Sequence, residues 1–290
     1  MEKYYLEPAF TMKKTYYLLA SILLITGAAK AQHLIAGSFN LRYNNPNDTG
    51  NLWVNRAPVA AALIRFHDFD VIGTQEGLEN QLQDLSKALP EYTRYGIGRD
   101  DGKQGGEHSA IFFKKDRFQL LKKGDFWLSA TPDKPGLGWD ATCCNRICSW
   151  VYLLDKQSKK KFYFFNAHFD HQGEIAREES SKLILKKMKE IAGTEKAVFT
   201  GDLNGDHESS WYQRLATSGY LKDTYTLVEH PYIFNASFHD FGKELDKDGV
   251  IDHVFVTGSP KVKRWGILTD SYRGKFPSDH FPVLTEFTFQ

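Results

Sequence analysis

The sequence predicts an α/β domain built around a mixed β-sheet. Short apolar runs alternate along the chain with longer helix-like stretches, a pattern that requires crossover connections between strands. Two of the runs, 147–154 and 162–167, are separated by a short polar segment and predict an antiparallel hairpin as well. No Pro- or Gly-rich linker interrupts the chain, and we therefore expect one domain from about Gln32 to Gln290.

The alternation comes from strand-like runs rich in aromatic and β-branched residues and from longer amphipathic stretches. The strand-like runs are Leu34–Asn40, Phe69–Thr74, Ser109–Phe113, Ile147–Leu154, Phe162–Ala167, Ala197–Thr200, Val250–Val256 and Phe281–Phe287. The helix-like stretches are Trp53–Phe66, Leu78–Leu89, Gly173–Ile191 and Glu208–Thr217. In the third stretch, Ile184, Met188 and Ile191 recur at spacings of four and three residues, which predicts a face packed on a core.

The N-terminus has the three parts of a secretory signal peptide. Met12-Lys13-Lys14 is basic, residues 16–27 are apolar, and Ala29-Lys30-Ala31 forms a small-x-small cleavage site. The apolar run is short for a membrane span, although an uncleaved anchor is the alternative. We therefore expect residues 1–31 to hold an upstream extension and a signal peptide that starts at Met12 and is cleaved after Ala31. The mature protein would be secreted or periplasmic, with no transmembrane segment.

The net charge argues against a general nucleic-acid binder. The whole chain is +1, and residues 1–31 carry four lysines and two glutamates, so the mature chain is about −1 (+1 − 4 + 2). Proteins that bind nucleic acids through phosphates usually carry a basic surface. Nucleic acid remains an alternative ligand, although the chain lacks such a basic surface. We expect the protein to be a monomer.

Three cysteines, Cys143, Cys144 and Cys148, lie within six residues of one another. Exported proteins can form disulfides. We expect any bridge to join Cys148 to Cys143 or Cys144 across the intervening turn, because a bridge between adjacent cysteines would be strained. A zinc site would need a fourth ligand that no nearby spacing supplies. The cluster therefore predicts a structural role.

Polar side chains stand where the apolar runs end. Four of them stand at the end of such a run or within two residues of it: Asn40, Glu76, His168 and Asp202. Any one of them has an ordinary explanation as a turn residue or a helix cap. Together they predict convergence, because ligands collect at the carboxyl ends of strands in open α/β sheets. Other polar residues adjoin these ends or the start of the last run: Asp170, His171, Asn204, Asp279 and His280.

Metal-assisted phosphate hydrolysis uses this set of side chains. Mg²⁺, or Mn²⁺ in its place, takes carboxylate ligands together with water and phosphate oxygens, and Glu76 is the best candidate ligand. Asp202 is suited to orient or deprotonate the attacking water. Asn40, Asn204 and a protonated histidine can donate hydrogen bonds to the charge that develops on the phosphoryl oxygens. The sequence therefore predicts a metal-dependent phosphoesterase.

These residues occur in motifs that resemble the endonuclease/exonuclease/phosphatase superfamily. In chain order the motifs are Ser38–Arg42, Gly73–Glu76, Glu107–Phe113, Asn166–His168, Gly201–Asn204, Ile251–Phe255 and Ser278–Val283. They span nearly all of the mature chain. The resemblance implies a four-layer αββα sandwich of two mixed β-sheets with outer helices, and an active site at one edge of the sandwich.

The resemblance also implies which residues handle the metal and the attacking water. Glu76 would bind the metal with Asp279 nearby, and Asn40 would support the metal or the phosphate. Asp202 would activate or orient the water, and Asn204 would hold the phosphate.

A second group is implied to contact the scissile phosphate. His280 would touch it while hydrogen-bonded to Asp252. His168 would be the second histidine on the phosphate side, oriented by Glu107, and Arg146 would be a further phosphate contact.

The chain departs from the superfamily pattern in places that bear on the substrate. Arg42 stands where apurinic endonucleases carry an Asp, as it does in the deoxyribonuclease branch. The segment 169–173, with Asp170 and His171, is expected to form part of the substrate pocket. A variable stretch is expected to lie over the substrate, and its notable residues are Trp127, Trp139 and Asp140.

Two other functions fit part of the pattern. A zinc hydrolase would use His168, Asp170 and His171, but it leaves the other motifs unexplained. A non-catalytic phosphate-ligand binding protein on the same fold predicts loss of Glu76, Asp202 or His280, and all three are present. A small phosphorylated metabolite or phosphodiester outside the cytoplasm is the preferred substrate class, with nucleotides, lipids, inositol phosphates, sugar phosphates and nucleic acids undecided.

Overall fold

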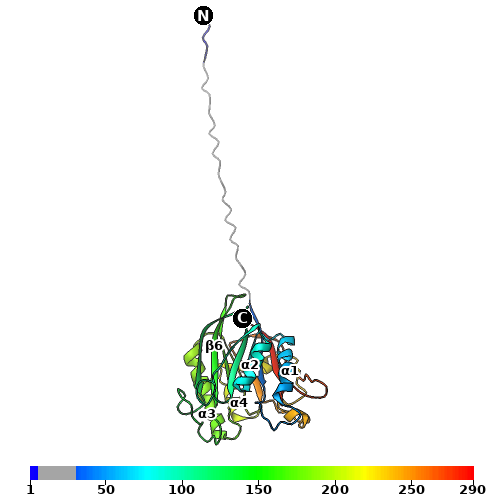
Figure 1. Ribbon diagram of the computed structural model, residues 1–290. Helices are drawn as coiled ribbons and strands as arrows, with labels where there is room; N and C mark the ends of the chain where they lie inside the picture. Colours follow the sequence, from blue (N-terminus) through cyan, green and yellow to red (C-terminus); the bar gives the residue numbers. More distant parts are fainter. Residues whose placement is uncertain (6–30) are drawn as a thin grey trace.

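Two six-stranded sheets form the centre of the computed structural model, which describes residues 1–5 and 31–290 (Figure 1). The strand order is β11-β12-β1-β2-β4-β3 in the first sheet and β5-β6-β7-β8-β10-β9 in the second. β1 and β2 pair in parallel, as do β7 and β8, and the pairs around them are antiparallel. Both sheets are therefore mixed.

The strand bounds follow the predicted runs closely in the centre of each sheet. The strands are β1 (Gln32–Asn40), β2 (Val71–Gly77), β3 (Tyr92–Tyr95), β4 (His108–Lys114), β5 (Phe118–Trp127), β6 (Ile147–Asp155), β7 (Lys161–His168), β8 (Ala197–Asp202), β9 (Leu221–Asp223), β10 (Asp252–Thr257), β11 (Lys261–Ile267) and β12 (Val283–Phe289). The four that the sequence did not predict, β3, β5, β9 and β11, are the four edge strands. Edge strands are short or carry charges that discourage further pairing, so they lack a clear apolar pattern.

Helices cover the outer face of each sheet. α1 (Trp53–Phe66) and α2 (Glu79–Ala88) pack on the first sheet, and α3 (Glu174–Ala192) and α4 (Ser210–Ala216) pack on the second. α1 and α3 lie on opposite sides of the strands in Figure 1. A third apolar layer fills the space between the sheets. The predicted four-layer αββα sandwich is confirmed.

The N-terminal prediction cannot be compared with this fold. The predicted signal peptide falls mainly on residues 6–30, which lie outside the described residues. Within residues 1–5 and 31–290, none of the helices has both the length and the apolar character that a membrane crossing requires.

A buried hydrogen-bond network joins the two sheets. Gln75 of β2 donates to Ser38 Oγ over 3.1 Å and to Asn166 Oδ1 of β7 over 2.7 Å. The Asn166 amide donates in turn to the carbonyl oxygens of Thr74 and Ala110, at 2.8 and 2.9 Å. Gln75 and Asn166 are fully buried. Because buried polar groups require partners, the network fixes the position of one sheet against the other.

Gly73 allows the sheets to approach at this network. A Cβ added at Gly73 would clash with Thr200 Oγ1 and lie 2.5 Å from Asn166 Oδ1. No larger residue fits there without separating the sheets, since interiors are close-packed. This explains why the strand that carries Glu76 has a glycine three residues before it.

Replacing Asn166 with Ala should destabilise the fold, because the buried carbonyl oxygens of Thr74 and Ala110 each lose a donor and the Gln75 amide loses one of its two acceptors. We expect a loss of about 2–4 kcal/mol in the free energy of unfolding, measured by urea denaturation. Asn47→Ala, at an exposed loop position, is the control and should change it by less than about 0.5 kcal/mol. Equal stabilities for the two variants would contradict the role given to the network.

Candidate active site

Strand alternation brings the predicted polar residues to one edge of the layer between the sheets. In β1 and β7 the residues four and six positions before the polar one lie on the same face, are apolar and fill that layer: Ala36 and Leu34 in β1, and Phe164 and Phe162 in β7. Side chains repeat every two residues along a strand. The same face therefore ends in a polar group in four strands, namely in Asn40, His168, Asp202 and, at the start of antiparallel β10, Asp252.

Glu76 reaches the site by a different route. Strict alternation after Gln75 would turn Glu76 toward the helices. The pairing of β2 with β4 contains a bulge between Thr74 and Gly77, and Glu76 has a positive φ of 61°. A bulge re-aims a side chain at the cost of local backbone strain. As a result, Glu76 Oε1 accepts a hydrogen bond of 3.0 Å from the Asn40 amide.

Asp202 lies at the centre of the site. Asn40 of the first sheet donates to Asp202 Oδ2 over 3.0 Å, and the backbone N–H of Asn204 donates to Asp202 Oδ1 over 2.9 Å. Burial raises the pKa of Asp202 to about 7, and the neighbouring charge of Asp252 adds to the effect. Asp202 can therefore take up a proton near neutral pH, as a general base must.

His280 and Asp252 form the hydrogen-bonded pair that the resemblance implied. His280 Nδ1 lies 2.8 Å from Asp252 Oδ2, and its Nε2 lies 3.8 Å from Asp202 Oδ2. Burial opposes protonation of His280, but the charges of Asp252, Asp202 and Asp279 outweigh it and raise its pKa to about 10. His280 is therefore an imidazolium at neutral pH, with Nε2–H directed toward the site.

His168 has the opposite character. Burial and the charge of Arg146 hold its pKa well below the usual histidine value, so the ring is neutral. The Asn204 amide donates to His168 Nε2 over 3.1 Å, which leaves the ring hydrogen on Nδ1. Glu107, expected to orient His168, approaches Nδ1 only to 4.0 Å and instead forms a two-bond ion pair with Arg99. Sequence reasoning missed Arg99, which stands in a loop without a recognisable motif.

Arg146 enters the site from the start of β6. Its Nη2 donates to His171 Nδ1 over 2.8 Å, and its Nε lies 3.4 Å from Asp170 Oδ2. Its Nη1 is buried without a hydrogen-bond partner among the described residues and is free for an anionic ligand. Arg146 and His171 line the cavity, as a phosphate contact must.

Asp170 lies behind the cavity instead of in its wall. Its Oδ1 accepts hydrogen bonds from the backbone N–H groups of Gln172 and Gly173, just before α3 begins. The carboxylate is buried and paired with Arg146. The predicted contact of Asp170 with substrate is thus corrected to a role in positioning Arg146 and the turn.

The residues expected to cover the substrate also have structural roles. The Trp127 indole donates to the Arg99 carbonyl oxygen over 2.7 Å. Asp140 accepts from the backbone N–H of Ala176 over 2.6 Å in the first turn of α3. Neither they nor Trp139 line the cavity, whereas Cys143 and Cys144 of the same stretch do, so the position of this stretch over the substrate stays a prediction.

The loop carrying Asp279 is fixed by a buried arginine that the sequence did not reveal. Arg56 of α1 donates to the carbonyl oxygens of Leu41 and Pro277, at 2.6 and 3.0 Å. Ser278 Oγ donates to the Asn40 carbonyl oxygen over 2.6 Å. An amphipathic helix pattern gives no sign that a charged residue turns inward, so only the fold identifies Arg56.

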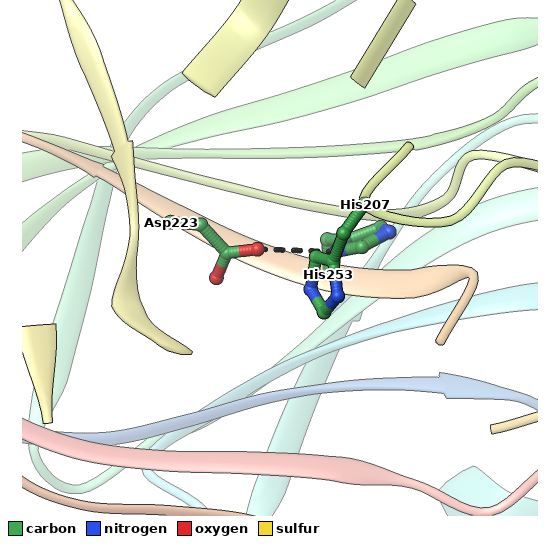
Figure 2. Close-up of side chains that lie close together, drawn as sticks. All are labelled: His207, Asp223 and His253. Atoms are coloured by element: carbon green, nitrogen blue, oxygen red, sulfur yellow. Dashed lines mark hydrogen bonds and ion pairs between the residues drawn. The ribbon is translucent and has the colours of Figure 1, made fainter. Parts of the chain in front are cut away.

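A cluster of two histidines and an aspartate lies behind the backbone that follows Asn204. His253 lies on the opposite face of β10 from Asp252, and Figure 2 shows it grouped with Asp223 and His207. Its Nδ1 lies 3.1 Å from Asp223 Oδ2 and its Nε2 lies 3.0 Å from the Gly205 carbonyl oxygen. Both ring nitrogens are thus engaged, and the cluster holds the backbone that follows Asn204.

The cysteine prediction is corrected. A disulfide joins the adjacent Cys143 and Cys144, and Cys148 is a free, buried thiol. β6 begins at Ile147 and places Cys148 in the apolar layer under α3, whereas the loop before it lies at the cavity. The strand therefore separates Cys148 from its expected partners.

The site residues line one open cavity of about 620 Å³. Its inner wall holds Glu76, Asp202 and His280. Gln172 of the predicted segment 169–173 also lines it, together with residues that sequence reasoning did not assign to the site: Tyr43, Arg99, Cys143, Cys144, Phe238 and Ile251. The volume accommodates a small phosphorylated molecule.

The carboxylates of Glu76 and Asp279 fit a divalent metal ion. Both line the cavity, and burial raises the pKa of Asp279 to about 6, an effect that the charge of Glu76 strengthens and that of His280 opposes. Crowded, buried carboxylates gain from a nearby cation, and their oxygens are the donors that Mg²⁺ prefers. His168, Asp170 and His171 do not group as metal ligands in the described part of the chain, which removes support from a zinc site there.

Comparison with known proteins agrees with this geometry. Residues 37–280 match the Endonuclease/Exonuclease/phosphatase family. The chain belongs to this family.

Similar family members include proteins of Bacteroides thetaiotaomicron. One, described as an endonuclease/exonuclease/phosphatase family protein, is 44% identical with a TM-score of 0.87, covering 90% of this chain and 99% of that one. Another, the mannosyl-6-phosphatase Bt3783, is 45% identical with a TM-score of 0.85, covering 88% and 100%. The uncharacterized protein L388 of Acanthamoeba polyphaga mimivirus is 30% identical over 256 residues, covering 81% of this chain and 92% of that protein.

The stability that His280 contributes should depend on pH. Its pKa in the folded chain is raised to about 10, so its contribution is complete below about pH 6.5 and is lost as pH rises through about 10. In metal-free protein, the difference in free energy of unfolding between wild type and His280→Gln should shrink over that range. Urea denaturation at several pH values measures it. His230→Gln, at an exposed histidine, should show no such change, and a constant or widening difference for His280→Gln would contradict the assignment.

Proposed function

We propose that the protein is a divalent-metal-dependent phosphomonoesterase that hydrolyses a small sugar phosphate outside the cytoplasm. The observation that carries the proposal is one cavity wall that holds a proton acceptor, Asp202, and a hydrogen-bond donor, the His280 imidazolium, beside two carboxylates. The 45% identity to a mannosyl-6-phosphatase supports a monoester of a sugar. The near-neutral charge supports a small substrate over nucleic acid.

The metal would be held by Glu76 and Asp279, with the Asn40 amide fixing Glu76. When bound, Mg²⁺ or Mn²⁺ neutralises charge on the phosphate and orients it. Activation of the attacking water would fall to Asp202 and the residues that hold it. The Asn40 amide and the Asn204 backbone N–H hold both carboxylate oxygens of Asp202, which orients it to accept a proton from the attacking water.

The phosphate would lie against the cationic side of the cavity. His280 Nε2–H donates to a phosphoryl oxygen, and Asp252 maintains its charge as negative charge develops in the transition state. Arg146 Nη1 donates to a second oxygen, from a guanidinium held in place by Asp170 and His171. Neutral His168 stays as a positioning group between Asp202 and Asn204.

We further propose that the mature protein is exported. The support is the basic, apolar and small-x-small pattern of residues 12–31. A disulfide between Cys143 and Cys144 is compatible with an oxidising compartment.

Replacing Asp202 with Asn or His280 with Ala should lower kcat by about 10²–10³-fold, because each change removes a group that acts in the transition state. We would assay the chain from Gln32 with Mg²⁺, Mn²⁺, Zn²⁺ or EDTA. The substrates are p-nitrophenyl phosphate, bis-p-nitrophenyl phosphate and a hexose 6-phosphate. Asp133→Asn, at an exposed loop position, is the matched carboxylate control and should retain wild-type activity.

Each outcome of this assay has a distinct meaning. Monoester turnover that requires Mg²⁺ or Mn²⁺ supports the proposal. A preference for bis-p-nitrophenyl phosphate would replace it with a phosphodiesterase, and activity that EDTA leaves intact would refute the metal role. No turnover with any metal, together with retained phosphate binding, would favour a binding protein.

A further inference from the structure

The disulfide between Cys143 and Cys144 stands at the mouth of the catalytic cavity. Both cysteines line the cavity together with Glu76, Asp202 and His280, and Cys143 is exposed. A bridge between adjacent residues cross-links no distant parts of the fold and closes no long loop. Its contribution to stability through chain entropy is therefore small, and its position raises the question of a role in binding.

The chain on both sides of the disulfide is anchored. Before it, the Thr142 hydroxyl donates to the side-chain oxygen of Gln172. After it, the Asn145 amide donates to Asp100 over 3.2 Å, and the Arg146 carbonyl oxygen accepts from Leu128. The two sulfur atoms are thus presented at a defined place, and a defined contact surface loses little entropy when a ligand binds.

The other apolar groups that line the cavity are Tyr43, Phe238 and Ile251, and all three are partly exposed. Phe238 packs edge-on against the His280 ring, with 5.1 Å between centroids. These groups and the polarisable sulfur atoms line the same cavity as the polar groups that would hold the phosphate. Ligand sites commonly combine such walls with a few placed polar groups.

The cavity offers little free positive charge beyond the phosphate position. Arg42 is paired with Asp48 at 2.9 Å and faces Asp279 at 3.6 Å, and Arg99 is paired with Glu107. A leaving group that carried further phosphates would lack cations to meet them. Among the described residues, the lining therefore suits an uncharged leaving group better than an anionic one.

We propose that the Cys143–Cys144 disulfide is a specificity-determining surface that packs against the apolar face of an uncharged sugar ring, the leaving group of the phosphomonoester. A hexose ring presents C–H groups on its faces and hydroxyl groups around its rim. The faces meet the sulfur atoms, and the rim reaches the amide of Gln172. This inference rests on the proposed function and adds to it the residues that select the leaving group.

The test is the double variant Cys143→Ser, Cys144→Ser in the chain from Gln32. Its KM for a hexose 6-phosphate should rise about five- to tenfold, because a small apolar contact is lost. Its inhibition constant for inorganic phosphate, which has no leaving group, should stay within about twofold of the wild-type value. Treating the wild type with the reductant TCEP should reproduce the change in KM, and TCEP should leave the double variant unaffected.

Cys148→Ala is the matched control, because this thiol is buried and free. It should leave both constants unchanged, and circular dichroism checks the fold of every variant. An unchanged KM in the double variant, or equal changes in KM and in the phosphate inhibition constant, would overturn the inference. Turnover of p-nitrophenyl phosphate but of no hexose phosphate would also overturn it while leaving a phosphomonoesterase in place. A protein that hydrolyses no phosphate ester would refute the proposed function and this inference with it.

Discussion

The hydrogen bonds between Gln75 and Asn166 are the constraint on which the active site depends. The site is divided between the two sheets: Asn40, Glu76, Asp279 and His280 come from the first, and His168, Asp202, Asn204 and Asp252 come from the second. Its two central contacts, Asn40 with Asp202 and His280 with Asp252, both cross between the sheets. Hydrogen-bond geometry tolerates errors of only a few tenths of an ångström, so the buried network below must hold the sheets in one relative position.

The region where the two sheets meet at the active site also contains several buried charged groups. Burial raises the pKa values of Asp202 and Asp279 and lowers that of His168, whereas at His280 it is overcome by the three carboxylates around the ring. Such an arrangement opposes folding when no cation or anion is bound, and rigid surroundings must sustain it. Positive φ angles at Arg42, Glu76 and Asn204 add strain at the same place. The apolar layers on either side supply the stability that the site does not.

The sequence was sufficient for the residues that obey strand periodicity. Asn40, His168 and Asp202 lie on the inner face of strands whose apolar pattern is regular, so their convergence followed from the pattern. Glu76 could be named, but a bulge, which no pattern reveals, turns it toward the site. The edge strands and Arg99 were missed because their residues resemble ordinary loop sequence, and the pairing of the cysteines depended on where β6 begins.

The residues that would carry out catalysis and those that would select the substrate lie on different parts of the fold. The groups that would act on phosphate are fixed to strand ends, where the network between the sheets sets their positions. The groups at the cavity mouth, such as Cys143, Cys144 and Gln172, stand on loops that only neighbouring loops anchor. Loops tolerate substitution far better than strands do. The fold can therefore exchange one leaving group for another without disturbing the junction that positions Asp202 and His280, and selectivity should be sought in the loops.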